Sequence, residues 1–134
     1  MIERAPETVR TAFVQVDGQV LKNAPLVGTR LWWAELLVPA TFPEPIPGQF
    51  VMVKAGTGHD PLLRRPFSVF EVLRDSGGAP AGVSLLSKRI GPSTTQLYLA
   101  QPGERMACLG PLGRPFSLVD DTTDAWMVAG GVGL

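Results

Sequence analysis

The chain has 134 residues, one cysteine and a net charge of zero, with 12 basic and 12 acidic side chains. A chain of this length can bury a hydrophobic core without disulfides. Its balanced charge argues against a nucleic-acid partner, and one cysteine cannot supply the roughly four thiolates of an iron–sulfur cluster. We find no spacing of His, Cys, Asp and Glu that suggests a metal site. No signal peptide and no apolar run of about 18 residues is present, so we expect no membrane span and a cytoplasmic protein.

Short apolar or alternating runs, separated by proline and glycine clusters, predict six β-strands. They are expected at about residues 9–16, 30–38, 49–54, 67–73, 83–90 and 105–109. One short helix is expected at residues 93–100, because Ser93 or Thr94 can cap its first turn and Pro102-Gly103 ends it soon afterwards. This order favours an all-β fold, a small antiparallel barrel whose closure removes exposed strand edges.

The last residues have a different pattern. The apolar run at residues 125–129 leads into Gly130-Gly131-Val132-Gly133, as a strand leads into the glycine-rich turn of a parallel nucleotide-binding sheet. A complete βαβ unit needs roughly 30 residues. We therefore predict a barrel domain at residues 1–120 and the first strand of a truncated nucleotide-binding α/β domain at residues 121–134. An unpaired apolar strand there would also favour a homo-oligomer.

The segment Arg65-Pro66-Phe67-Ser68 is the first candidate for a binding site. On a strand, Arg65 and Phe67 share one face while Pro66 and Ser68 share the other. Such a strand can place an arginine beside a phosphate and an aromatic ring against a flat heterocycle. An edge strand with a charged first residue is the alternative interpretation.

The start of the predicted helix is the second candidate. Its first backbone amides lack helical partners and carry a partial positive charge. Gly91 allows a phosphate to approach, Thr94 adds a hydroxyl, and Arg65 can complete the site. An ordinary capped helix would have the same sequence. Lys88 can steer a ligand or can simply end a strand in solvent.

The adjacent Trp32 and Trp33 cannot both face the core from one strand. The outward ring either forms a patch where a partner docks or covers one end of the barrel.

Together these motifs resemble the ferredoxin-reductase superfamily, most closely the electron-transfer subunits of two-component dihydroorotate dehydrogenases. The resemblance also includes Pro47-Gly48-Gln49-Phe50 and Gly110-Pro111-Leu112-Gly113. It implies a six-stranded antiparallel Greek-key barrel that binds FAD. Arg65 matches the arginine that holds the FAD phosphates, Phe67 replaces a common tyrosine, and Ser68 matches the residue near flavin N5.

The resemblance further implies that Gly91 and Thr94 belong to the pyrophosphate loop, where Ser93 replaces the usual glycine. Backbone groups of residues 86–88 are expected against the flavin ring. Gly131 and Gly133 match the opening of a nicotinamide-nucleotide domain. The implied cofactor-binding residues are thus Arg65, Pro66, Phe67, Ser68, Leu86, Ser87, Lys88, Gly91, Ser93, Thr94, Gly131 and Gly133, with no catalytic residue and no metal ligand.

By this resemblance, the expected function is electron transfer in an oxidoreductase of pyrimidine biosynthesis. A full-length subunit would pass electrons from NAD(P)H to FAD and through an iron–sulfur cluster to a catalytic dehydrogenase subunit. The present chain lacks the nucleotide and cluster regions, and we expect it to be inactive alone. The alternatives are an electron-transfer subunit of a hydrogenase or of an NADPH–ferredoxin complex, and a non-enzymatic β-barrel binding module. The neutral charge and single tyrosine argue against that last class.

Overall fold

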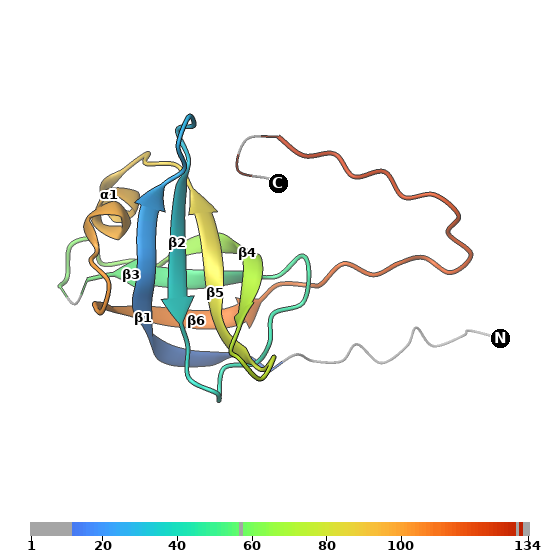
Figure 1. Ribbon diagram of the computed structural model, residues 1–134, viewed down its shortest axis with the longest axis horizontal. Helices are drawn as coiled ribbons and strands as arrows, with labels where there is room; N and C mark the ends of the chain where they lie inside the picture. Colours follow the sequence, from blue (N-terminus) through green and yellow to red (C-terminus); the bar gives the residue numbers. More distant parts are fainter. Residues whose placement is uncertain (1–11, 57, 131, 133–134) are drawn as a thin grey trace.

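The computed structural model describes residues 12–56, 58–130 and 132. Neighbouring strands pair antiparallel and close a six-stranded barrel in the order β1-β2-β5-β4-β3-β6. A single helix, α1, precedes the last strand and lies at one end of the barrel (Figure 1). This confirms the predicted antiparallel barrel with one short helix. The elements are β1 (Val14–Pro25), β2 (Trp32–Leu37), β3 (Phe50–Ala55), β4 (Arg65–Arg74), β5 (Pro80–Ser87), α1 (Pro92–Leu99) and β6 (Arg105–Leu112).

The predicted bounds of β1 were wrong. The strand was expected at residues 9–16, of which 9–11 lie outside the described residues, but it runs from Val14 to Pro25. Its second half lacks a regular apolar alternation, because Val20 and Leu21 are adjacent and the polar Lys22 and Asn23 follow them. It forms because β1 pairs with a different neighbour along each half, with Gly18 opposite Met106 of β6 and Asn23 opposite Ala34 of β2. Backbone pairing to two neighbours does not require apolar side chains on the solvent face.

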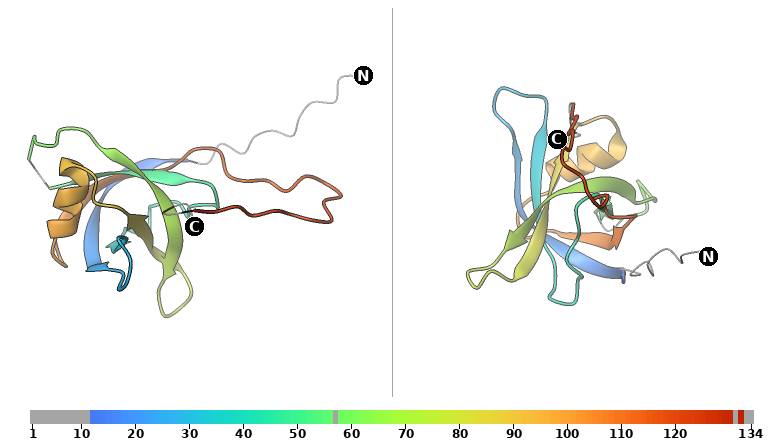
Figure 2. Two further views of the ribbon diagram at one scale, coloured as in Figure 1. Left: turned by 90° about the horizontal axis from the view of Figure 1, so that it is seen from above. Right: turned by 90° about the vertical axis from the view of Figure 1, so that its right-hand side faces the viewer.

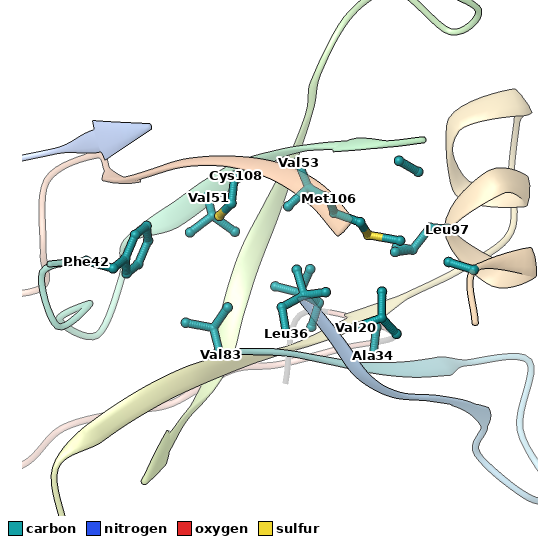
Figure 3. Packing of buried hydrophobic residues seen from close by; sticks show 13 residues of the cluster. Val20, Ala34, Leu36, Phe42, Val51, Val53, Val83, Leu97, Met106 and Cys108 are labelled. Atoms are coloured by element: carbon teal, nitrogen blue, oxygen red, sulfur yellow. The ribbon is translucent and has the colours of Figure 1, made fainter. Parts of the chain in front are cut away.

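Side chains fill the interior of the barrel. Leu36, Val51, Val83 and Cys108 are completely buried, as befits a small barrel whose inward positions form the core. Phe42 lies at one end of this cluster and Leu97 of α1 at the other (Figure 3). A ligand must therefore bind outside the barrel.

The motif at residues 47–50 holds the barrel to the chain that follows β6. Gln49 is buried; its Oε1 accepts a hydrogen bond from the Ile46 amide (3.0 Å) and its Nε2 donates to the Gly113 carbonyl (3.0 Å). Gly48 has a φ of +95°, and a Cβ there would lie 2.9 Å from the amide nitrogen of Phe116. These residues meet the end of the Gly110–Gly113 motif, so both motifs serve the fold.

The described part of the C-terminal segment, residues 113–130, forms no strand. It runs away from the barrel and turns back toward it (Figures 1 and 2). The strand expected at residues 125–129 was wrong, because a strand needs a hydrogen-bonded neighbour and this stretch pairs with none of the described residues. Trp126 and Met127 are 91% and 95% exposed. A second domain at residues 121–134 stays a prediction. No helix of the described residues is long and apolar enough to cross a membrane.

Candidate functional site

A pocket of about 580 Å³ opens between β4, the end of β5 and the beginning of α1. This volume lies within the range of about 300–1,000 Å³ that is common for small-molecule sites. Every cofactor-binding residue expected from the sequence lines it except Gly131 and Gly133, which lie outside the described residues. The lining comprises Arg65, Pro66, Phe67, Ser68, Leu86, Ser87, Lys88, Ile90, Gly91, Pro92, Ser93, Thr94 and Val132.

Three of these residues were missed by the sequence reasoning. Ile90 and Pro92 flank Gly91, and treating the loop as one unit would have included them. Val132 comes from the C-terminal segment, which turns back toward the barrel, and no local sequence signal connects it with β4.

Strand β4 supplies one wall of the pocket and alternates as expected. Phe67 and Val69 pack against the barrel core, whereas Pro66 and Ser68 are exposed. Phe67 therefore has two roles, because its ring is anchored on the core and also lines the pocket. Arg65 is exposed at the start of the strand and makes no side-chain hydrogen bond or ion pair within the described chain. Its guanidinium is free to bind an anion.

The beginning of α1 supplies the opposite wall. Gly91 is the N-cap, and a glycine has no side chain with which to bond the amides of the first turn. The first helical hydrogen bond runs from the Thr95 amide to the Gly91 carbonyl (2.9 Å). The amides of Ser93 and Thr94 have no hydrogen-bond acceptor among the described residues. A Cβ on Gly91 would meet no atom within 4 Å, so the space beside these amides is open.

Ser93 or Thr94 was expected to cap the helix, but Gly91 is the N-cap and the Thr94 hydroxyl instead bonds the loop before the helix. Its Oγ1 accepts hydrogen bonds from the amides of Ile90 (2.9 Å) and Gly91 (3.0 Å) and donates to the Gly91 carbonyl (3.1 Å). The hydroxyl proton is thus already committed to the loop. Only the backbone amide of Thr94 remains to bind a ligand, so the expected hydroxyl contact does not fit this arrangement.

The electrostatics of the pocket favour an anion. Among the described residues, its lining contains the cations Arg65 and Lys88 and no acidic side chain. Arg89 is turned aside, because its Nε donates to Oγ1 of Thr95 on α1 (3.0 Å). The free amides of α1 add the positive end of a helix dipole.

At the end of β5, the Ser87 carbonyl already accepts a hydrogen bond from the Tyr98 hydroxyl (3.4 Å), and burial raises the pKa of Tyr98. Leu86 stands opposite Trp33 in the ladder of β2 and β5, whereas Lys88 follows the end of β5.

The titratable groups usually used in catalysis lie elsewhere. His59 is exposed in the loop before β4. Cys108 is completely buried in the core, and burial raises the pKa of its thiol to about 11. Among the described residues, no group of His, Cys, Asp and Glu could hold a metal ion.

The pocket has the chemistry to hold a ligand that combines a flat ring with phosphates. One apolar wall with an anchored aromatic ring can contact a flat heterocycle, while Arg65 and two free amides can bind phosphate oxygens. The acid-free lining agrees with that assignment. The sequence motifs and the tertiary structure thus place the same chemistry at one site.

Comparison with known proteins finds electron-transfer subunits of dihydroorotate dehydrogenase B among the relatives of this chain. The chain is 38% identical over 109 residues to the electron-transfer subunit of dihydroorotate dehydrogenase B (NAD(+)) from Desulforamulus reducens, covering 81% of this chain and 40% of that protein. It is 35% identical over 125 residues to the subunit of the same name from Bacillus cereus, covering 90% of this chain and 46% of that protein. The chain thus spans less than half the length of these curated relatives. No protein-family model matches it.

Solved structures share the fold. A ferredoxin reductase of carbazole 1,9a-dioxygenase superposes with a TM-score of 0.69 at 21% identity, over 90% of this chain and 36% of that one. An Amycolatopsis cytochrome P450 reductase superposes with a TM-score of 0.63 at 22% identity, over 83% of this chain and 32% of that one. At such low identity these neighbours establish the barrel fold and no more.

Proposed function

Because the chain resembles the electron-transfer subunits of dihydroorotate dehydrogenase B in sequence and ferredoxin-reductase barrels in fold, we propose that it is the FAD-binding part of such a subunit. The main support is the pocket between β4 and α1, where an unpaired arginine faces two free helix amides in an acid-free lining. Bound FAD would supply the chemistry, since it can accept a hydride and give up electrons singly. The chain's own residues bind it, orient it and adjust its surroundings.

The residues divide this work between the two ends of the cofactor. Arg65 and the amides of Ser93 and Thr94 bind the diphosphate. Phe67 gives the ring system an apolar contact that the core holds in place. Ser68 would offer its hydroxyl to the ring system, and the strand end at residues 86–88 would border it.

The wider assignments belong to the whole protein and rest on the relatives. They are the oxidation of NAD(P)H, an iron–sulfur cluster, a catalytic dehydrogenase partner, a role in pyrimidine biosynthesis and a cytoplasmic location. Gly131 and Gly133 are proposed as the beginning of the nucleotide-binding region. For the residues of this chain itself, the proposal is FAD binding.

The direct test is the visible absorption spectrum of the purified chain after FAD has been added and the excess removed. We expect flavin bands to stay with the protein. Arg65→Ala should weaken FAD binding at least tenfold, equivalent to about 1.4 kcal/mol, because it removes the charged partner of the phosphates. Arg74→Ala is the matched control, since Arg74 pairs with Glu44 (2.5 Å) and does not line the pocket. A folded but colourless wild-type chain would refute the proposal.

A further inference from the structure

Helix α1 has little packing of its own to hold it in place. It is eight residues long, and Leu97 is its one buried residue. Its other leucine, Leu99, is 67% exposed. An isolated helix of this length is not stable in water. Its position beside the pocket must therefore come from contacts with the barrel.

Asn23 of β1 provides the main polar contact. Its Nδ2 donates to the carbonyls of Leu97 (2.6 Å), Tyr98 (3.2 Å) and Ala100 (2.9 Å). The last carbonyls of a helix lack partners within it, so a single amide here satisfies acceptors that would otherwise be unpaired. Asn23 thus ends the helix and attaches it to a strand 74 residues earlier in the chain.

Two aromatic side chains complete the attachment. The indole Nε1 of Trp32 donates to Oδ1 of Asn23, which fixes the orientation of the amide. The ring of Trp32 stacks on that of Tyr98, with centroids 4.5 Å apart and planes 14° from parallel. The Tyr98 hydroxyl donates to the Ser87 carbonyl at the end of β5 (3.4 Å). We call Asn23, Trp32 and Tyr98 the helix clamp.

The helix clamp connects two of the elements that border the pocket, α1 and the end of β5, without lining it. Tyr98 belongs to α1, and its hydroxyl bonds the carbonyl of Ser87 at the end of β5, whose side chain lines the pocket. The other long-range side-chain bond of α1, from Gln96 to the Asp60 carbonyl (2.7 Å), is exposed to solvent. The partly buried clamp is the firmer of the two attachments.

We infer that the helix clamp positions the first turn of α1 for phosphate binding, with Asn23 as its central positioning residue. The inference rests on the proposed function, because it concerns the same FAD site. A helix moves as a unit, so a displaced C-terminal end also displaces the amides of Ser93 and Thr94 relative to Arg65. Loss of the clamp should therefore affect the phosphates of a ligand and spare its ring system.

Ligands with and without phosphate separate this role from general stability. We would measure the affinities of FAD and of riboflavin, which has no phosphate, for wild type, Asn23→Ala and Tyr98→Phe. Asn23→Ala should weaken FAD on the order of tenfold and riboflavin less than twofold. Tyr98→Phe keeps the stacked ring and should shift the same ratio by a smaller factor. Gln19→Ala is the control, because it removes one exposed bond to the Gly103 carbonyl (3.3 Å) from the same strand.

The inference is overturned if the ratio of FAD to riboflavin affinity is unchanged in both clamp variants, whether neither affinity changes or both fall by the same factor. Hydrogen exchange without flavin gives an independent readout. The amides of residues 95–99 should exchange faster in Asn23→Ala, while those of β3 and β4 stay as in wild type. If wild type binds neither flavin, the proposed function fails, whereas selective exchange in α1 still supports the clamp. Unchanged exchange in α1 overturns it.

Discussion

Gly82 lies near the beginning of β5, between β2 and β4, and its replacement by alanine should destabilise the barrel. Gly82 pairs with Leu37 of β2 and Leu73 of β4. A Cβ at this position would lie 2.4 Å from the Leu36 carbonyl oxygen and 3.1 Å from Cδ1 of Leu73. The closer of these atoms belongs to the backbone of a paired strand, so it cannot yield as a flexible side chain would.

The magnitude follows from the distance. Ordinary contact begins near 3.4 Å, so β2 and β5 must separate by about 1 Å where they are hydrogen-bonded. Forcing extra atoms into a packed region costs about 1–3 kcal/mol, and weakened ladder bonds add about 1 kcal/mol each. We expect Gly82→Ala to lower the free energy of unfolding by about 3 kcal/mol. Since β5 continues to Ser87 at the pocket, FAD binding should weaken as well.

Urea unfolding followed by tryptophan fluorescence would measure this loss. Gly58→Ala is the matched control, because a Cβ there meets no atom within 4 Å and no positive φ is involved. It should change the free energy of unfolding by less than about 0.5 kcal/mol. If the free energy of unfolding of Gly82→Ala also stays within about 0.5 kcal/mol of wild type, with an unchanged m-value, the reasoning from strand spacing is wrong.

Three further predictions concern single side chains. Thr94→Ala should cost about 1 kcal/mol of stability, because the hydroxyl that holds the loop before the helix is lost. In a flavin fluorescence titration it should weaken FAD binding less than Arg65→Ala does. An equal or larger loss of affinity in Thr94→Ala would make the loop the dominant contact. Native Cys108 should resist thiol reagents at pH 8. The pKa of this thiol is raised to about 11, against 9.0 for a free thiol, so the unfolded chain loses the proton at lower pH than the folded chain. The free energy of unfolding should therefore fall between pH 9 and 11, by up to about 1.4 kcal/mol per pH unit. A Cys108→Ala variant whose free energy of unfolding falls equally steeply with pH would contradict this. Gln49→Ala should cost about 2–3 kcal/mol because it strands a buried amide and a carbonyl, whereas exposed Gln101→Ala should cost little in the same thermal melt.

Local patterns were sufficient where local forces decide the structure. Alternating apolar residues place β3 and β4 within a residue or two of their predicted bounds, because alternation determines which side chains face the core. The helix was predicted within one residue of its bounds, although its N-cap is Gly91 and not Ser93 or Thr94 as expected. The same alternation along β4 predicted which of its side chains pack against the core and which are exposed.

Contacts between distant segments could not be read in this way. The second half of β1, which has no regular apolar alternation, becomes a strand because β2 pairs with it. The Thr94 hydroxyl reads as a ligand donor until the loop folds back and uses it. Trp32 and Trp33 look equivalent in sequence, yet Trp32 stacks on Tyr98 at the end of the barrel while Trp33 meets Phe70 edge-on (5.1 Å).

The sequence by itself determined the strand pattern, the capped helix and the residue types that can bind a phosphate and a flat ring, because these depend on neighbours a few positions apart. Only the tertiary structure decided that those residues line one pocket and that Asn23 holds the helix beside it. Closing the barrel brings residue 23 against residue 97, and a separation of 74 positions leaves no periodic signal in the chain. Such contacts arise when buried backbone groups must find partners, and the partner is whichever side chain the closed barrel places there.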